Sequence, residues 1–375
     1  MAGIYVHVPF CRKACHYCDF HFSTSLAKRT EMVDAICKEL LDRKAEITEE
    51  IETIYFGGGT PSVLNVAELQ DIISQIQKHY SLSDSIEVTL EANPDDCSMI
   101  NLDMWKSAGV NRLSIGVQSF RQEDLEWMNR SHNSLQAVEA IENAHKAGFE
   151  AINLDLIYGI PSMPTATWHQ NVALALDLPI DHISAYSLTV EPGTALNHFI
   201  NNKKYPALKD EKAAEELEYF QQAIEDKGWE QYEISNYCKP NAYAVHNTNY
   251  WRQKPYIGVG PSAHSYGNGT RRWNIANNAK YLKAIGEGQP FWEQEELTVS
   301  DQVNERIMLG LRTKWGVDLV ELQTVYGYAL LEIYKEEINA FLSSKHVKVT
   351  EGRLYLTKAG IMLGDHIASE LFMVE

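Results

Sequence analysis

The chain has 375 residues, and its 33 basic and 51 acidic side chains give a formal charge of −18. This acidic balance argues against nucleic acid as the main partner, because binding to phosphates needs a basic surface. The sequence contains no run of about 18 apolar residues of the kind that spans a membrane. It begins in a strand-like stretch, which indicates no signal peptide. We therefore expect a cytoplasmic protein with one large and one smaller domain.

Apolar runs of strand length alternate with helical patterns in the first 228 residues. Strands are predicted at 4–8, 51–56, 86–91, 112–118, 151–158 and 183–188. Helices are predicted at 29–46, 66–79, 98–108, 121–129, 134–147 and 209–227. Such alternation indicates parallel strands joined by right-handed crossovers. Because a full eight-unit barrel takes about 250 residues, we expect residues 1–228 to form an incomplete, laterally open (β/α)6 barrel of the α/β class. A doubly wound open sheet is the alternative.

The rest of the chain has a different pattern. Residues 229–297 are rich in Tyr, Asn, Trp and Gly, and we expect a loop-rich connecting region with a short strand near 232–234. Helical patterns follow at 300–312, 318–324 and 328–343, then a predicted hairpin at 346–357 and a last helix at 358–371. This order is typical of a winged-helix module. Residues 298–375 should therefore form a smaller α+β winged-helix-like domain.

Three of the six cysteines fall within eight residues, at Cys11, Cys15 and Cys18, directly after the first predicted strand. Thiolates are ligands that suit zinc, copper(I) or iron–sulfur clusters. A structural zinc site would need a fourth ligand, which a nearby histidine could supply. Three thiolates on a four-iron cluster would instead leave one iron open to another ligand. A zinc knuckle is therefore the alternative to an iron–sulfur site.

Polar residues and glycines follow the other predicted strands, where ligands of parallel sheets bind. The run Gly57-Gly-Gly-Thr60-Pro61 would let a backbone approach a ligand closely, and a tight turn, which needs only one or two glycines, is the alternative. Glu91 and Asp155 are carboxylates in apolar strands, and burial of a lone carboxylate is costly. We expect them to contact a ribose, an ammonium group or the iron site, and a buried structural pair is the alternative. Arg130 could also simply cap a neighbouring helix.

The segment His246-Asn-Thr-Asn-Tyr250-Trp251 is the second unusual stretch. An imidazole is a common axial ligand of haem iron, and the two aromatic rings could stack on a planar molecule. A histidine in a polar loop, however, is by itself more often solvated or hydrogen-bonded.

The spacing C-x3-C-x2-C, with Tyr17 before the last cysteine, resembles the radical S-adenosylmethionine (SAM) family, in which SAM chelates the open iron. Motifs along nearly the whole chain resemble the oxygen-independent coproporphyrinogen III oxidase family. They are Ile4–Cys11, Gly57–Pro61, Gly116–Phe120, Met128–Arg130, Asp155–Pro161 and Gly258–His264. Within that family the chain is most similar to the HemW branch, the haem chaperones. Phe20 stands where authentic oxidases carry a further cysteine, and His246–Trp251 matches the H-N-x-x-Y-W motif of the branch.

This resemblance implies that Cys11, Cys15 and Cys18 hold a [4Fe-4S] cluster and that His246 is linked to haem. The residues that match family positions around SAM are Tyr5, Tyr17, Gly58, Gly59, Thr60, Glu91, Gln118, Arg130 and Asp155. The implied function is binding of haem and its transfer to acceptor haem proteins such as respiratory cytochromes. A homodimer and transient membrane association are further expectations. The alternative function is a radical SAM enzyme that decarboxylates a porphyrinogen, which the missing fourth cysteine argues against.

Overall fold

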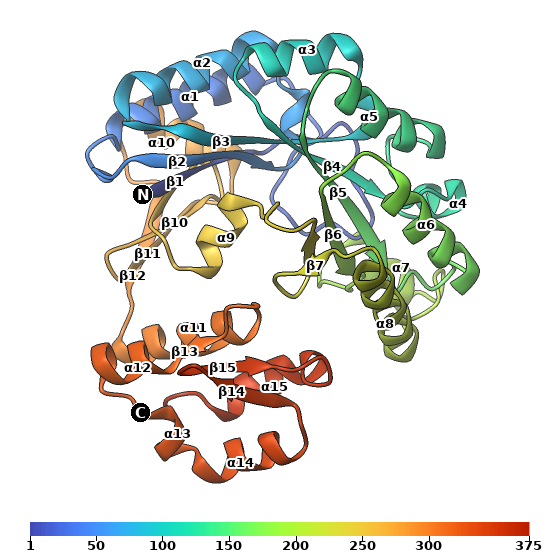
Figure 1. Cartoon of the computed structure of the whole chain (residues 1–375). Coiled ribbons are helices and arrows are strands. Elements are labelled where there is room, and N and C mark those ends of the chain that lie inside the picture. Colours follow the sequence, from blue (N-terminus) through green and yellow to red (C-terminus); the bar gives the residue numbers. More distant parts are fainter. Residues whose placement is uncertain (375) are drawn as a thin grey trace.

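The computed structural model describes residues 1–374, and its amino-terminal part is a curved sheet covered by helices (Figure 1). The six parallel strands are β1 (Ala2–Val8), β2 (Ile51–Gly58), β3 (Leu82–Ala92), β4 (Arg112–Gln118), β5 (Ala151–Tyr158) and β6 (His182–Ser187). They lie side by side in chain order. This order has no switch point, which argues against the doubly wound alternative. The expected incomplete (β/α)6 barrel is confirmed.

Eight helices connect or follow these strands and cover the outer face of the sheet (Figure 1). They are α1 (Arg29–Asp42), α2 (Val66–His79), α3 (Met99–Ser107), α4 (Gln122–Trp127), α5 (Ser134–Lys146), α6 (Thr165–Asp177), α7 (Ala195–Asn201) and α8 (Asp210–Asp226). Short 3-10 turns, η1 (Pro61–Val63) and η2 (Pro94–Asp96), follow β2 and β3. The sequence analysis missed α6 and α7. The inner face of α6 is short, with Trp168, Val172 and Ala175 buried, and gives a weak helical pattern.

Residues 229–297 correct the expectation of a loop-rich connection, because they extend the same sheet at both edges. Beside β6 lie β8 (Asn236–Cys238) and β7 (Glu230–Gln231), and beside β1 lie β9 (Tyr256–Val259), β10 (His264–Gly267), β11 (Thr270–Asn274) and β12 (Trp292–Glu296). Two helices, α9 (Val245–Trp251) and α10 (Asn278–Glu287), belong to the same segment. The chain between β8 and β9 therefore crosses the open side of the partial barrel and carries α9 there (Figure 1).

The carboxy-terminal domain lies below the barrel in Figure 1 and has its own core. Its elements are α11 (Val299–Leu311), β13 (Val317–Asp318), α12 (Leu319–Tyr326), α13 (Leu330–Ile333), α14 (Lys335–Ser343), β14 (Val347–Thr350), β15 (Arg353–Leu356), η3 (Ile361–Leu363) and α15 (Gly364–Glu370). The hairpin turns at Glu351 and Gly352, which both have positive φ, as a two-residue hairpin loop requires. The expected winged-helix-like arrangement is confirmed, with the predicted helix 328–343 split in two. No helix within residues 1–374 combines the length and hydrophobicity needed to cross a bilayer.

Candidate functional site: a cavity at the rim of the partial barrel

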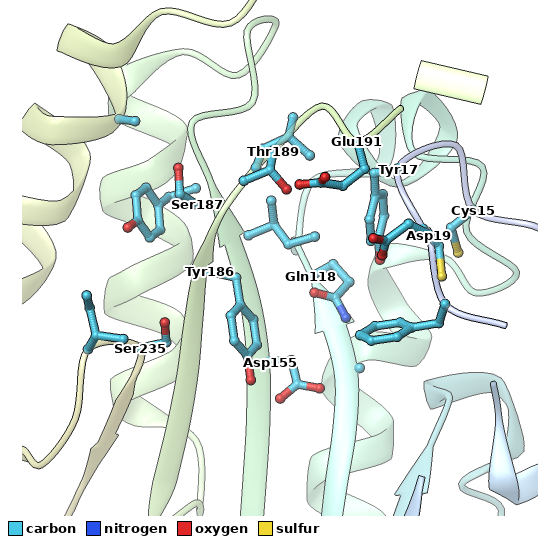
Figure 2. Close-up of a pocket in the computed structure, with 18 of the residues that line it drawn as sticks. Cys15, Tyr17, Asp19, Gln118, Asp155, Tyr186, Ser187, Thr189, Glu191 and Ser235 are labelled. Carbon is cyan, nitrogen blue, oxygen red and sulfur yellow. The ribbon is translucent and has the colours of Figure 1, made fainter. Parts of the chain in front are cut away.

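A cavity of about 990 Å³ opens at the carboxyl ends of the barrel strands. Eleven of the thirteen predicted site residues line it: Cys11, Cys15, Tyr17, Cys18, Gly58, Gly59, Thr60, Glu91, Gln118, Arg130 and Asp155. Figure 2 shows side chains from several strands and from the cysteine loop facing one space. Parallel strands end at the same rim, and that is why residues from distant parts of the chain meet here. Two predicted residues, Tyr5 and His246, lie outside the lining.

The cysteine loop is held against two donors from other parts of the chain. Thr60 Oγ1 donates a 3.3 Å hydrogen bond to Cys11 Sγ, and Arg130 Nη1 donates one of 3.2 Å to Cys15 Sγ. Burial raises the pKa of the Cys11 thiol to about 11 and that of Cys18 to about 12. Metal ligation requires the thiolate form and releases these protons. Hydrogen bonds to sulfur suit thiolates that carry charge.

The described residues contain no group of side chains already arranged to bind a zinc ion. Thiolates around one tetrahedral zinc ion lie about 4 Å from one another. Within residues 1–374, no three His, Cys, Asp or Glu side chains are grouped to hold a single metal ion.

The glycine run at the end of β2 is packed tightly against the start of the cysteine loop. A Cβ on Gly59 would lie 2.6 Å from the Phe10 carbonyl oxygen, and Gly58 has a φ of 104°. The Gly59 and Thr60 N–H groups donate to the Val8 and Phe10 carbonyls. Contacts from this run to a ligand would therefore come from carbonyl oxygens rather than from these two N–H groups. The glycines serve both the tight turn and the shape of the cavity.

Two carboxylates stand at the floor of the cavity. Glu91 Oε1 accepts a 2.8 Å hydrogen bond from the Tyr55 hydroxyl, and Asp155 Oδ1 accepts one of 2.6 Å from Asn153 Nδ2. Burial raises the pKa of Glu91 to about 7 and that of Asp155 to about 6. Their hydrogen bonds go to different partners, which argues against a structural pair. Buried carboxylates of this kind favour a cationic or hydroxyl-bearing ligand.

Arg130 bridges the cysteine loop and the barrel strands. Its Nη2 donates to Asn93 Oδ1 at 2.8 Å and to the Gly116 carbonyl at 2.6 Å, while Nη1 reaches Cys15. Its Nε is buried without a partner. The side chain of Arg130 is therefore a bridge, while its backbone N–H donates a 2.8 Å hydrogen bond to the Leu125 carbonyl and closes the carboxyl end of α4. Arg130 thus has both the capping role and the contact with the cysteine loop. Gln118 ends β4 with a φ of 68°, an uncommon conformation for a residue with a side chain, and it faces the cavity in Figure 2.

Tyr5 and His246 form a layer beneath the cavity. The His246 side chain is 2% exposed, and it stacks on the ring of Tyr55 with 5.0 Å between centroids. Both imidazole nitrogens have partners at 2.8 Å, Nδ1 with Thr53 Oγ1 and Nε2 with the Tyr250 hydroxyl. Burial lowers the pKa of His246 to about 3. Tyr5 stacks on Tyr55 at 6.1 Å.

The motif that contains His246 is helical, whereas the sequence analysis placed it in a loop. Glu87, on β3, accepts hydrogen bonds of 3.0 Å from the backbone N–H groups of Val245 and His246, at the first turn of α9. This contact satisfies free N–H groups at the start of the helix. It also directs His246 into the barrel. No local sequence signal indicates this, because Glu87 lies far away along the chain.

The cavity has an outer part that the sequence analysis missed. Tyr186, Ser187, Thr189, Glu191 and Ser235 line the wall beyond Asp155 (Figure 2). The carboxy-terminal domain supplies Arg312 and residues 361–366. Arg312 and residues 361–366 join the site only because the two domains pack together, and no motif marks any residue of this outer part.

Comparisons with known proteins agree with this geometry. The Radical SAM superfamily matches residues 5–175, and the HemN C-terminal domain matches residues 297–363. The solved structure of coproporphyrinogen III oxidase (HemN) from Escherichia coli has a TM-score of 0.87 and 21% identity, and covers 99% of this chain and 90% of its own. The fold and the site therefore define a radical SAM protein. Such a domain implies a [4Fe-4S] cluster and SAM.

Two curated relatives match over nearly their whole length. "Heme chaperone HemW" of Bacillus subtilis is 34% identical over 98% of both chains, and that of Lactococcus lactis is 32% identical over 98% of this chain and 97% of its own. A zebrafish protein, "Radical S-adenosyl methionine domain-containing protein 1, mitochondrial", is 36% identical over 70% of this chain and 60% of its own. The chain belongs to the HemW family, as its motifs predicted.

Proposed function

We propose that this protein is a haem chaperone that binds haem and transfers it to acceptor haem proteins. The observation that carries the proposal is the similarity, along 98% of both chains, to a protein named heme chaperone. The position of Phe20 supports it, because this exposed side chain lines the cavity where the oxidases carry a further cysteine. The acceptor, a homodimer, contact with a membrane and location in the cytoplasm stay predictions.

We infer that Cys11, Cys15 and Cys18 hold the [4Fe-4S] cluster. Two features of the chain fit this role. The three thiols face the cavity from one loop, and Thr60 and Arg130 donate hydrogen bonds to two of their sulfurs. The rigid glycine turn beneath the loop fixes its position.

We assign SAM to the adjoining part of the cavity. The Glu91 carboxylate suits an ammonium group, and the Asp155 carboxylate suits ribose hydroxyls. Gly58, Gly59 and Thr60 would meet the same molecule along its length, with Gln118 and Tyr17 on its other sides. When bound, the cluster and SAM supply one-electron chemistry. The residues of the chain bind and orient the two groups and exclude water from between them.

His246 remains our prediction for a haem-linked residue, but the structure around it must change before it can bind iron. Its imidazole is enclosed and both nitrogens are already hydrogen-bonded. Binding of haem iron at His246 would therefore require Tyr250 to move away, together with part of α9.

The second candidate function is radical decarboxylation of a porphyrinogen. It is favoured by the similarity of fold to the E. coli oxidase and by the eight of nine residues predicted for SAM that line the cavity. It is opposed by Phe20 in place of the further cysteine.

One anaerobic experiment separates the two functions. The cluster-reconstituted protein is titrated with haem, then mixed with apomyoglobin as a probe acceptor, and in parallel is supplied with SAM, a reductant and coproporphyrinogen III. A chaperone binds haem saturably, passes it to apomyoglobin and forms no decarboxylated product. If the protein does not bind haem saturably and decarboxylates coproporphyrinogen III robustly, the chaperone proposal is wrong and the protein is an oxidase.

A further inference from the structure

The outer part of the large cavity is an apolar space between the barrel and the carboxy-terminal domain. The barrel wall is lined by Tyr158, Leu188 and Leu217, and the opposite wall by Met362 and Leu363 of η3. Met362 is 61% exposed and Leu363 is 38% exposed, although both are large apolar side chains facing a cavity. Exposed apolar residues gathered at a concave site are typical of a ligand-binding surface. Two apolar walls of this kind suit a large, apolar ligand.

This apolar space contains an imidazole that the proposed SAM site does not use. His366 lies four residues after Met362, at the start of α15, and lines the cavity with an exposed side chain. Its ring packs edge-on against Phe341 at 6.5 Å. Histidine is a common axial ligand of haem iron, and methionine is a known second ligand. Unlike His246, His366 can reach a ligand in the cavity without any rearrangement.

The charges around the cavity orient a molecule with two carboxylates. Asp19, Glu191 and Asp210 line the wall near the cysteine loop and α8, and they would repel propionate groups. A smaller cavity of about 220 Å³ adjoins the other end and shares Ile234, Arg312 and Ile361 with the large one. Its lining includes three basic residues, Arg312, Lys314 and Lys348. Carboxylates are therefore favoured at that end.

Two acidic side chains, Asp365 and Glu233, also line the cavities at the basic end. Asp365 accepts hydrogen bonds from Arg312 Nη2 at 2.5 Å and from Nε at 3.1 Å, which leaves the Nη1 edge of the guanidinium. Glu233 also lines the smaller cavity. Burial raises its pKa to about 7, so a large share of this carboxyl group is protonated near neutral pH. Lys314 is itself paired with Glu230 at 2.5 Å, so Arg312 and Lys348 are the cations that this end offers to a carboxylate.

We propose that haem binds in the outer part of the large cavity, with its iron bound by His366 and its propionates directed toward Arg312 and Lys348. This inference rests on the proposed chaperone function, and it places the haem iron at His366 instead of at the enclosed His246. Haem and SAM would then occupy adjoining parts of one cavity, and the carboxy-terminal domain would form half of the haem site.

The test is an anaerobic haem titration of the cluster-reconstituted full chain, followed by visible and electron paramagnetic resonance spectra. The variants are His366→Ala, His366→Met and His246→Ala, with His145→Ala as the control because His145 is an exposed histidine on α5 outside both cavities. We expect His366→Ala to weaken binding by about tenfold or more and to lose the spectrum of a histidine-ligated haem. We expect His366→Met to keep haem with an altered spectrum, since methionine is also an iron ligand. His145→Ala should match the parent.

The outcomes distinguish this inference from the proposed function. If the parent binds haem and His366→Ala binds it equally with the same spectrum, the inference is wrong while the chaperone function stands. If only His246→Ala loses haem, and its circular dichroism spectrum shows that it is folded, the site is at His246. A parent that binds no haem contradicts the chaperone function itself. Because His366 is exposed, its variants should fold, and circular dichroism checks this.

The propionate end has a separate readout. The parent should bind haem more tightly than haem dimethyl ester, because the ester lacks the two carboxylates. The double variant Arg312→Gln and Lys348→Gln should lose most of this preference while still binding the ester. Asp365→Asn, which leaves both cations in place, is the matched control and should keep the preference. An unchanged preference in the double variant would show that the propionates lie elsewhere.

Discussion

Tyr55 donates a 2.8 Å hydrogen bond to Glu91, and this single contact connects the cavity to the layer beneath it. The same tyrosine ring stacks on His246 of α9, which enters the barrel from the segment that crosses its open side. The predicted SAM residue Glu91 and the predicted haem residue His246 are therefore joined through one side chain. Several measurable consequences concern these residues and their neighbours.

The first prediction concerns the cysteine loop. Cys15→Ser should yield protein that contains little iron or acid-labile sulfide and lacks the brown colour after anaerobic reconstitution, because one of the three proposed cluster ligands is lost. Cys37→Ser is the matched control, since Cys37 is likewise a half-buried free thiol but lies on α1 outside the cavity. Chemical analysis of iron and sulfide measures the effect. Equal iron in both variants would rule out Cys15 as a ligand.

The second prediction concerns SAM binding and pH. The pKa of Glu91 is about 7, so its carboxylate form increases as the pH rises through this value. SAM affinity should therefore rise between about pH 5.5 and 7.5, below the range in which an α-amino group itself deprotonates. Calorimetric titration of the reconstituted protein measures the profile. Glu91→Gln should flatten it, and Tyr55→Phe should shift it to higher pH, because the hydrogen bond from Tyr55 lowers the pKa of Glu91. A parent profile without this rise would exclude Glu91 as the ammonium contact.

The third prediction concerns stability without ligands. The pKa of Glu91 rises from 4.5 to about 7 in the folded chain, so the folded state binds this proton more tightly than the unfolded state. The contribution to stability is then present below about pH 4.5 and is lost as the pH rises toward 7. Glu91→Gln should consequently raise the melting temperature of the cofactor-free protein at pH 8 more than at pH 5. An equal rise in melting temperature at pH 5 and at pH 8 would contradict the raised pKa of Glu91.

The fourth prediction concerns His246 as part of the core. His246→Ala should lower the free energy of unfolding by about 2 kcal/mol or more, because it removes packing on Tyr55 and leaves the Thr53 and Tyr250 hydroxyls without their partner. Urea denaturation of the haem-free protein measures this loss. Tyr250→Phe, which removes one of the two hydrogen bonds, should lose less. An alanine variant as stable as the parent would mean that the ring is not enclosed in solution.

The fifth prediction concerns the glycine run. Gly59→Ala should destabilise the protein by about 1–3 kcal/mol and weaken SAM binding, since its Cβ would be 2.6 Å from the Phe10 carbonyl oxygen. Gly286→Ala, on α10 with open space around the added Cβ, is the control and should be neutral or slightly stabilising. Thermal melting and SAM titration compare the two. If neither substitution changes the melting temperature or SAM binding, the turn at Gly59 is not tightly packed.

The sequence alone determined the barrel and the inner part of the site. Each strand of the first 228 residues is a compact apolar run, and helices with a clear apolar face follow most of them. Once the strands are parallel, their carboxyl ends must share one rim. Residues such as Cys11, Glu91 and Asp155 are then brought together by topology, whatever the details of packing.

The tertiary structure decided the features that depend on contacts between distant segments. The strands of residues 229–297 are two to five residues long, and their hydrogen bonds to β1 and β6 leave no periodic pattern in the chain. His246 is enclosed because Glu87 fixes the start of α9, and Arg312 and His366 reach the cavity because the carboxy-terminal domain packs over the barrel. Local sequence specifies which residues form a strand or a helix, whereas burial of a given side chain is set by the surfaces that meet around it.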